Sequence, residues 1–335
     1  MAKEGLTRAG DIKEKDSLVS MGEIMKAAGY KPPTAVQTRL IESSEEIREG
    51  APEEIAYQHS VLCQTSLPYR STTERRWEAR NGNVMLLVQA GEAYDPNKEQ
   101  WVQLPLPFGP KARLILMYLN SQAIRTQSAV IDVEDSMTAF LRELQGRDPN
   151  GDEIHAFKKQ LSALARAKIS MAGSAGMDGD VARTVQGDLP IVKFIELWFP
   201  KNSNQRVLWP GTLELTKDYF DDLTKHAVPL DQRAIAALSH NARALDIYAW
   251  LAQRLWRVSS TRPYKVTWVN LHQQFGHEYK QIRQFRAAFL KTLKSVQTQY
   301  PEARIDADAG GLILRNSPPP IRKKPHQISG ALTHG

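Results

Sequence analysis

Residues 279–294, YKQIRQFRAAFLKTLK, carry five cations and no carboxylate. At 100° per residue, the large apolar side chains recur on one side of a helix, and the cations lie opposite or flank them. Like charges on one helix face repel each other, and the segment has no acidic residue to offset the repulsion. A face of this kind is typical of a surface that binds a polyanion. A one-signed face that serves only solubility is the alternative that the helix alone leaves open.

The outward side chains of this helix have the chemistry needed to contact double-stranded DNA in the major groove. Arg283 and Gln284 are the predicted base-contacting residues, because Arg pairs with guanine and Gln with adenine through two hydrogen bonds. The neighbouring cations are predicted to neutralise phosphates, which fix position rather than sequence. These phosphate-contacting residues are Lys280, Arg286, Lys291 and Lys294.

An earlier helix, predicted over residues 152–167, offers a second polar face. We expect Phe157, Leu161 and Leu164 on its buried side. The predicted DNA-binding residues outside that buried side are Lys158, Lys159, Gln160, Ser162 and Arg166. The surrounding region is electrically neutral, so we expect it to bind DNA more weakly. Arg183, in a Gly-rich hairpin, is either a minor-groove contact or a solvated loop cation.

The charge is unevenly distributed along the chain. The formal net charge is +7, and residues 201–335 hold 20 Lys and Arg against 10 Asp and Glu, counted from the sequence. A basic region of this kind attracts nucleic acid through its phosphates. A membrane partner is not expected, because the basic helix has no separate exposed apolar flank and no apolar run approaches the ~20 residues of a membrane span.

Signals of enzymatic or metal chemistry are missing from the sequence. The Gly-rich stretch 173–179 lacks the Lys-Ser/Thr ending of a P-loop, and His277-Glu278 lacks the second His of a helical zinc motif. Nor does a paired-histidine motif with a nearby tyrosine, as in nicking enzymes, appear. The single Cys63 cannot form an internal disulfide and is expected in the core. We therefore expect a cytoplasmic protein that is not an enzyme and has no metal or cofactor.

Hydrophobic periodicity and turn residues predict the elements that position these side chains. A helix over 35–48 precedes a strand at 60–66 and a hairpin of 77–80 with 84–88, joined by Asn81-Gly82. Helices are then predicted over 111–125, 136–144 and 152–167, with a short strand at 129–133 between the first two. Segments 169–171 and 191–199 are expected to form a long β-hairpin around the Gly-rich stretch.

The same order of elements recurs about 130 residues downstream. Residues 242–248 echo 112–118, and Ile282, Phe285 and Phe289 match Ile154, Phe157 and Leu161. A strand at 265–269 and a hairpin of 304–306 with 312–314 complete the second series. Helix, short strand, helix, turn, helix and hairpin is the order of a winged helix-turn-helix, and constant spacing of several landmarks indicates a repeat.

The sequence therefore predicts an α+β fold with two tandem winged-helix domains, mainly helical with β-hairpin wings. Their ranges are 56–228 and 229–318. Residues 1–55 are predicted to be an N-terminal arm, partly disordered or helical, and 319–335 a flexible basic tail. Trp250, Trp256 and Trp268 could stack on single-stranded bases, but their spacing favours packing in the core.

Many dispersed positions resemble the plasmid-encoded RepA-type replication initiators. They include LPLPFGPKARLIL at 104–116, residues 122–128, WPGTLELTKDYFDDLTKHAVPL at 209–230, residues 242–251, and positions from Tyr279 to the Ser-Pro-Pro at 317–319. The resemblance covers about residues 58–320 and leaves the first 55 residues outside. Residues 132–135, DVED, depart from the shorter turn that is usual in the family, which leaves the start of the following helix uncertain.

This resemblance implies a theta-type plasmid initiator that binds repeated sequences at the plasmid origin as double-stranded DNA, promotes opening, and recruits the host replication initiator and helicase. Such proteins often repress their own promoter as well. Self-association is left open. The alternative within DNA binding is a sequence-specific transcriptional repressor without initiator activity. Two tandem DNA-binding units favour long asymmetric sites, whereas a repressor more often uses one unit per subunit and a palindrome.

Overall fold

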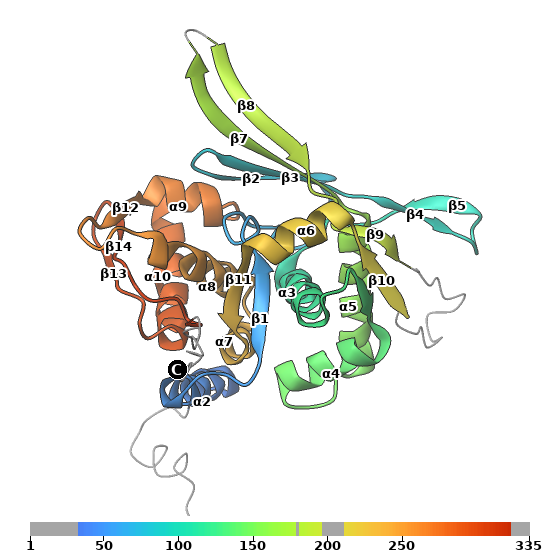
Figure 1. The fold of residues 1–335 in the computed structure, drawn as a ribbon, viewed down its shortest axis with the longest axis horizontal. Helices are drawn as coiled ribbons and strands as arrows, with labels where there is room; N and C mark the ends of the chain where they lie inside the picture. The colour runs from blue at the N-terminus through green and yellow to red at the C-terminus, as the bar shows by residue number, and fades with distance from the viewer. Residues whose placement is uncertain (1–32, 179–180, 196–210, 323–335) are drawn as a thin grey trace, which may run out of the picture. The chain divides into compact units, whose positions relative to one another are not determined.

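The computed structural model describes residues 33–178, 181–195 and 211–322 (Figure 1). Within these ranges, two series of elements follow the same order. The first series consists of α3 (Gly109–Thr126), β6 (Val130–Asp132), α4 (Glu134–Gln145), α5 (Gly151–Arg166), β9 (Val192–Ile195) and β10 (Thr212–Leu215). The second consists of α8 (Ala242–Arg254), β12 (Tyr264–Thr267), α9 (Trp268–Phe275), α10 (Ile282–Gln299), β13 (Ile305–Ala307) and β14 (Gly311–Leu314).

The two series also share the strand order of their sheets. The first sheet has the order β6-β10-β9 and the second the order β12-β14-β13, and all neighbours are antiparallel. In each sheet the last strand of the series lies between the other two. Leu213 pairs with Ile131 and Ile195, and Leu312 pairs with Val266 and Ala307. The helices and short strands of the predicted repeat are therefore confirmed in their order, although the strands of residues 168–188 interrupt the first series between α5 and β9. The shared strand order of the two sheets extends the likeness.

Local sequence signals explain where several of these helices begin. Pro110 lies in the first turn of α3, where its missing N–H costs nothing. Asn150 and Glu153 form a reciprocal capping box at the start of α5. Asn241 and Thr267 accept backbone hydrogen bonds at the starts of α8 and α9. Each cap satisfies an N–H that has no partner within its helix.

A four-stranded sheet contains the hairpin predicted at Asn81-Gly82. That hairpin is confirmed as β2 (Arg76–Asn81) and β3 (Val84–Gln89), with Gly82 at a φ of 58°. The sheet is larger than expected, because β7 (Lys168–Asp178) and β8 (Val181–Asp188) add to it in the order β2-β3-β7-β8. The long hairpin is thus β7–β8, and the predicted pairing of 169–171 with 191–199 is wrong. Residues 192–195 form β9 and pair with β10, while 196–199 lie outside the described residues.

The segment before this sheet also differs from the prediction. Residues 60–66 form a turn rather than a strand, because the Cys63 and Gln64 amides donate to the His59 and Val61 carbonyls. The strand ends just before, as β1 (Ile55–His59), and pairs with β11 (Ala227–Asp231). The predicted domain boundary between residues 228 and 229 falls inside β11.

Six further elements complete the list for the described residues. Helices α6 (Lys217–His226) and α7 (Gln232–Leu238) flank β11, and the short helix η1 (Leu255–Arg257) follows α8. Strands β4 (Glu92–Asp95) and β5 (Gln100–Gln103) form a separate two-stranded hairpin. Helix α2 (Ala35–Glu49) confirms the helix predicted over 35–48.

The C-terminal half of α2 is held by side chains of α7 and α10. The Arg233 guanidinium donates to the Glu46 and Gly50 carbonyls, at 2.7 and 2.8 Å, which have no helical partner of their own. Two hydrogen bonds to the Asp231 carboxylate orient the guanidinium. Gln299 donates to the Leu40 carbonyl at 2.7 Å. Residues 40–50 of the predicted arm are therefore fixed on the fold.

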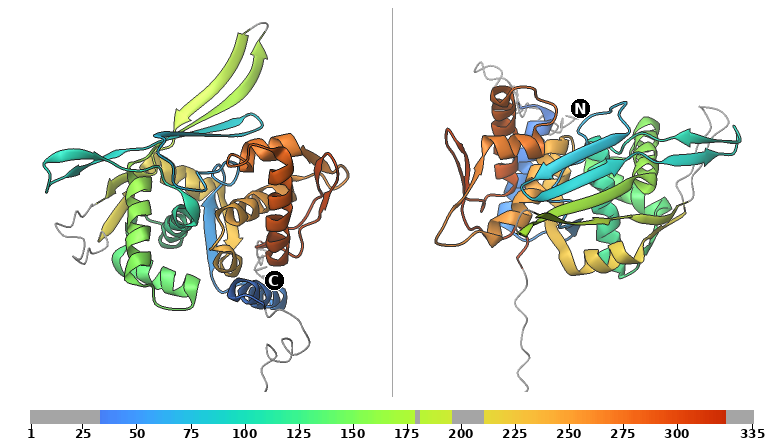
Figure 2. Two further views of the ribbon diagram at one scale, coloured as in Figure 1. Left: turned by 180° about the vertical axis from the view of Figure 1, so that it is seen from behind. Right: turned by 90° about the horizontal axis from the view of Figure 1, so that it is seen from above.

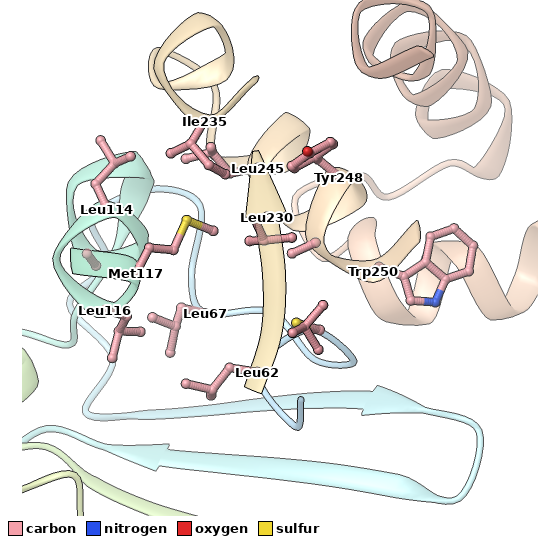
Figure 3. Close-up of a cluster of buried hydrophobic side chains, with 14 of the residues drawn as sticks. Leu62, Leu67, Leu114, Leu116, Met117, Leu230, Ile235, Leu245, Tyr248 and Trp250 are labelled. Carbon is pink, nitrogen blue, oxygen red and sulfur yellow. The ribbon is translucent and has the colours of Figure 1, made fainter. Parts of the chain in front are cut away.

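The hydrophobic core runs through both repeats. Helices α3 and α8 are buried around most of their circumference, as expected for helices at the centre of a domain. Figure 3 shows Met117 of α3, Leu230 of β11 and Leu245 of α8 in one cluster of side chains. Side chains of the two predicted domains thus pack together.

A buried ion pair joins the two central helices. The Arg113 guanidinium of α3 donates to both carboxylate oxygens of Asp246 on α8, each at 2.8 Å. Its remaining N–H groups donate to the Leu67, Pro68 and Gly109 carbonyls, at 2.7, 3.1 and 2.9 Å. All five donors of a guanidinium are therefore satisfied. Such satisfaction offsets the cost of burying the charge.

We predict that Arg113→Ala and Asp246→Ala each lower the free energy of unfolding by about 3–5 kcal/mol, because each leaves one buried charge without its partner. The double variant Arg113→Met/Asp246→Leu should lose much less than the sum, since it removes both charges and retains volume. Urea unfolding followed by circular dichroism measures all three. Additive losses in the double variant would contradict a coupled pair.

Candidate nucleic-acid interface

Helix α10 is fixed by aromatic side chains on its inner side. Phe285 and Phe289 are fully buried and contact each other, and Phe289 also packs against Trp268 and Phe275 of α9. Leu293 and Val296 continue this buried side along the helix. Because the inner side is anchored at four positions, the opposite face is held in one orientation.

The outer face of α10 carries cations that pair with no carboxylate. Arg283, Gln284, Lys291 and Lys294 are exposed, and so is Lys280 just before the helix. Within the ranges that the structure covers, Arg283, Lys291 and Lys294 take part in no ion pair or side-chain hydrogen bond. The structure therefore places these side chains where the sequence predicted them. Their predicted contacts with DNA remain a prediction.

Arg286 has a different environment from the other cations of α10. It is half-buried, its guanidinium lies 5.0 Å from the centre of the Trp268 ring, and it donates to the Asp308 carbonyl at 3.3 Å. These contacts fix the turn between β13 and β14 against α10. Arg286 thus positions this turn, and its predicted phosphate contact remains a prediction.

Asp308 organises the turn that Arg286 holds. Its carboxylate accepts hydrogen bonds from the Gly310 and Gly311 amides, at 2.7 and 2.8 Å, and pairs with Lys265 at 2.7 Å. The hydrogen bond from Lys265, followed by that from Gly310, lowers the pKa of Asp308. Trp268 Nε1 also donates to the Asp308 carbonyl. The turn is therefore joined to β12, α9 and α10.

In the first repeat, the polar side of α5 is partly occupied by contacts within the chain. Lys159 and Arg166 are exposed, whereas Lys158 and Ser162 are half-buried. The Ser162 hydroxyl donates to the Lys158 carbonyl, and Arg166 Nε donates to the Glu92 carbonyl at 3.0 Å. Arg166 thereby ties the end of α5 to β4.

A groove of about 600 Å³ runs beside the outer side of α5. Residues 72–75 and 103–105 form one wall, and His155, Lys158, Lys159 and Ser162 of α5 form the other. The Arg75 guanidinium holds the first wall through hydrogen bonds to the Leu104 and Ala90 carbonyls. Two other segments therefore lie next to the face of α5 that was predicted to contact DNA.

The prediction that Gln160 lies on the outer side of α5 is wrong. Gln160 is 3% exposed, and its Oε1 accepts a hydrogen bond of 2.8 Å from the Phe108 amide, just before α3. Phe157, Gln160, Leu161 and Leu164 follow the spacing of a single buried helix face. The side-chain amide of Gln160 is tolerated in this buried place because it supplies the acceptor that the Phe108 N–H needs. In this position Gln160 cannot reach DNA.

The remaining candidates divide between the core and the surface. Trp250 and Trp268 are buried, as expected from their spacing. Trp256 is 49% exposed, so the expectation that it packs in the core is wrong. It lies in η1, beyond the end of α8, so the spacing that buries side chains of α8 does not extend to it. The side chain of Arg183 lies outside the described part of the structure.

The described part of the chain has neither a metal-binding cluster of side chains nor a membrane-spanning helix. Its His, Cys, Asp and Glu residues form no group of three or more that could hold a metal ion. None of its helices has both the length and the apolar character to cross a membrane. Cys63 is buried and unpaired, as expected for a core thiol.

Comparison with known proteins finds a family match in the middle of the chain. Residues 106–270 match the family described as "Plasmid encoded RepA protein". This stretch, from the start of α3 into α9, therefore carries the domain of a plasmid replication protein family, and the resemblance predicted from the sequence is confirmed. The matched stretch ends before α10. Comparison with curated proteins found no match.

Two solved structures resemble the fold. One is described as selenomethionine derivatives of domain 2 and domain 3 of RctB, with a TM-score of 0.49 and 8% identity, covering 77% of this chain and 98% of that one. The other is described as RctB domains 2-3, with a TM-score of 0.46 and 8% identity, covering 76% of this chain and 94% of that one.

We predict that Asp308→Ala loosens the β13–β14 turn, because the Gly310 and Gly311 amides and Lys265 lose their acceptor. Hydrogen exchange at these two amides should become faster, while exchange in α8 stays unchanged. Asp308→Asn is the matched control, since it retains Oδ1 and loses only the charge. Equal exchange in Asp308→Ala and the unchanged protein would show that the carboxylate does not hold the turn.

Proposed function

We propose that this protein is a plasmid replication initiator that binds repeated double-stranded sequences at the plasmid origin through α10. The observation that carries the proposal is the cationic face of α10, on which Arg283, Lys291 and Lys294 are exposed without carboxylate partners in the described ranges. Cations that would otherwise repel each other are stabilised when phosphates lie against them. The family of residues 106–270 supports the replication role.

We propose that each series of elements is a winged helix. In such a unit the helix after the turn enters the major groove, and the hairpin that follows lies beside it. For the second series this assigns α10 to the groove and β13–β14 to the wing. Arg283 and Gln284, in the first turn of α10, would then contact base edges, while Lys280, Lys291 and Lys294 would contact phosphates.

We propose a weaker DNA contact for the first series. Gln160 is buried, Arg166 donates to the Glu92 carbonyl, and residues 72–75 and 103–105 flank α5. Lys159 remains exposed on this helix. The first unit would therefore add phosphate attraction, and most of the base recognition would come from α10.

The other steps of initiation are part of the same proposal. The protein would promote opening of the duplex and recruit the host replication initiator and helicase in the cytoplasm, acting without enzymatic activity of its own. It would also repress its own promoter, and self-association stays open. A repressor without initiator activity is the second candidate. Footprinting on DNA next to the protein's own gene separates them, because an initiator should protect an array of asymmetric repeats.

We predict that Arg283→Ala weakens binding to the protected repeat by about 1–3 kcal/mol and leaves binding to scrambled duplex almost unchanged, because a base contact carries sequence preference. Fluorescence anisotropy on both duplexes measures the difference. Equal losses on the two duplexes would remove Arg283 as a base-contacting residue.

We predict that Lys291→Ala weakens binding to all duplexes alike, because it removes a phosphate contact. The slope of log K against log salt should fall by about 0.9. Lys217→Ala is the matched control, since Lys217 is also an exposed helical lysine but pairs with Asp221. A salt slope that changes equally in both variants would show that only net charge matters.

We predict that Lys159→Ala reduces affinity less than Lys291→Ala does, because the flanked α5 approaches DNA less closely. Both variants remove one exposed helical lysine, so their net charges are the same. The same anisotropy titrations, at one salt concentration, compare them directly. A larger loss for Lys159→Ala would assign the main phosphate contact to the first unit.

A further inference from the structure

Helix η1 and the start of β12 each present one exposed aromatic ring, and an arginine covers one side of each ring. The Arg257 guanidinium lies 4.4 Å from the centre of the Trp256 ring, and that of Arg254 lies 4.1 Å from the centre of the Tyr264 ring. Trp256 is 49% exposed and Tyr264 is 45% exposed. We call these four residues the aromatic platform.

The platform lies in a stretch without acidic residues. No Asp or Glu occurs between Asp246 and Glu278, and the stretch contains Arg254, Arg257, Arg262 and Lys265. Lys265 pairs with Asp308. The three arginines form no ion pair with a carboxylate in the part of the chain that the structure describes. The hydroxyl groups at positions 259–261 lie in the same connection.

The backbone that carries the platform is held in place by the C-terminal segment. Asn316 Nδ2 donates to the Trp256 and Val258 carbonyls, at 3.2 and 2.7 Å, and the Ser317 amide donates to the Leu255 carbonyl. Within the connection, the Ser259 hydroxyl accepts from the Thr261 and Arg262 amides. The exposed rings are therefore presented by a fixed backbone, which reduces the entropy lost when a ligand stacks on them.

We propose that the aromatic platform binds single-stranded DNA. Exposed rings offer stacking surfaces to bases, and arginines beside them offer cation–π contacts and charge for phosphates. A duplex cannot use these rings in the same way, because its base faces are covered by neighbouring bases. The absence of acidic residues from the stretch disfavours a basic protein partner and favours a polyanion.

This site uses none of the α10 residues assigned to duplex recognition. It extends the proposed function, since a protein that promotes opening beside its binding repeats has separated strands within reach. The two sites are tested by different substitutions. If Arg283→Ala failed to give its expected result, the proposal of single-strand binding would still stand. If the platform variants failed to weaken single-strand binding, the proposal of duplex binding through α10 would still stand.

The test uses the full chain and a fluorescently labelled 20-nucleotide oligo(dT), with anisotropy as the readout. Trp256→Ala and Tyr264→Ala should each weaken binding by about 5- to 150-fold, the effect of losing one stacked base. Trp256→Phe should retain most of the affinity, because it retains an aromatic ring. Binding to the origin duplex should stay within about twofold in all three variants.

Trp101→Ala is the matched control. Trp101 is 62% exposed on β5 and contacts the Tyr94 ring, on a hairpin whose charges are mainly acidic. Its loss should not change binding to oligo(dT). Unchanged single-strand affinity in Trp256→Ala, with native circular dichroism, would overturn the proposal. Equal losses on duplex and single strand, or an equal loss in Trp101→Ala, would overturn it as well.

Discussion

The bidentate pair between Arg113 and Asp246 is the interaction on which the arrangement of the two repeats depends. Helix α5 packs on α3, and α10 packs on α8, so the two helices proposed to contact DNA are each supported by the helix that carries one partner of the pair. Figures 1 and 2 show α5 and α10 on opposite sides of the central helices. Because the guanidinium uses all its donors, another arrangement of α3 and α8 would leave a buried charge unsatisfied.

The repeat itself explains why arginine occurs at this place in both units. Arg243 stands 130 residues after Arg113, and both guanidinium groups lie 4.9 Å from the centre of the Tyr69 ring. Arg243 pairs with Glu278 at 2.7 Å and donates to the Tyr279 hydroxyl, just before α10. The sequence echo around these arginines therefore reflects a shared structural position. Tyr69, which precedes both repeats, lies between their two cations.

Sequence patterns predicted the elements whose partners are close along the chain. The helices of both series, the Asn-Gly hairpin and the β13–β14 turn carry local signals, namely periodicity, caps and glycine. Strand partners were not predictable in the same way, because the alternation of apolar and polar residues along a strand does not say which strand lies next to it. Examples are the pairing of β9 with β10 and the pairing of β7 with β3. Gln160 was misplaced because polarity was taken as exposure, although its spacing matched the buried face. Trp256 was misplaced because its apolar character was taken as burial.

The pairing of β1 with β11 has a consequence for synthesis on the ribosome. Strand β1 is complete about 170 residues before its neighbour is made, as residue numbers 59 and 227 show. Until then the edge of β1 has N–H and C=O groups without partners. The Arg113 side chain also lacks its carboxylate partner until Asp246 is synthesised. Nascent chains that stop in the first half would thus be open to misassociation. Genetic truncation near residue 228 should yield insoluble fragments rather than a separate working module.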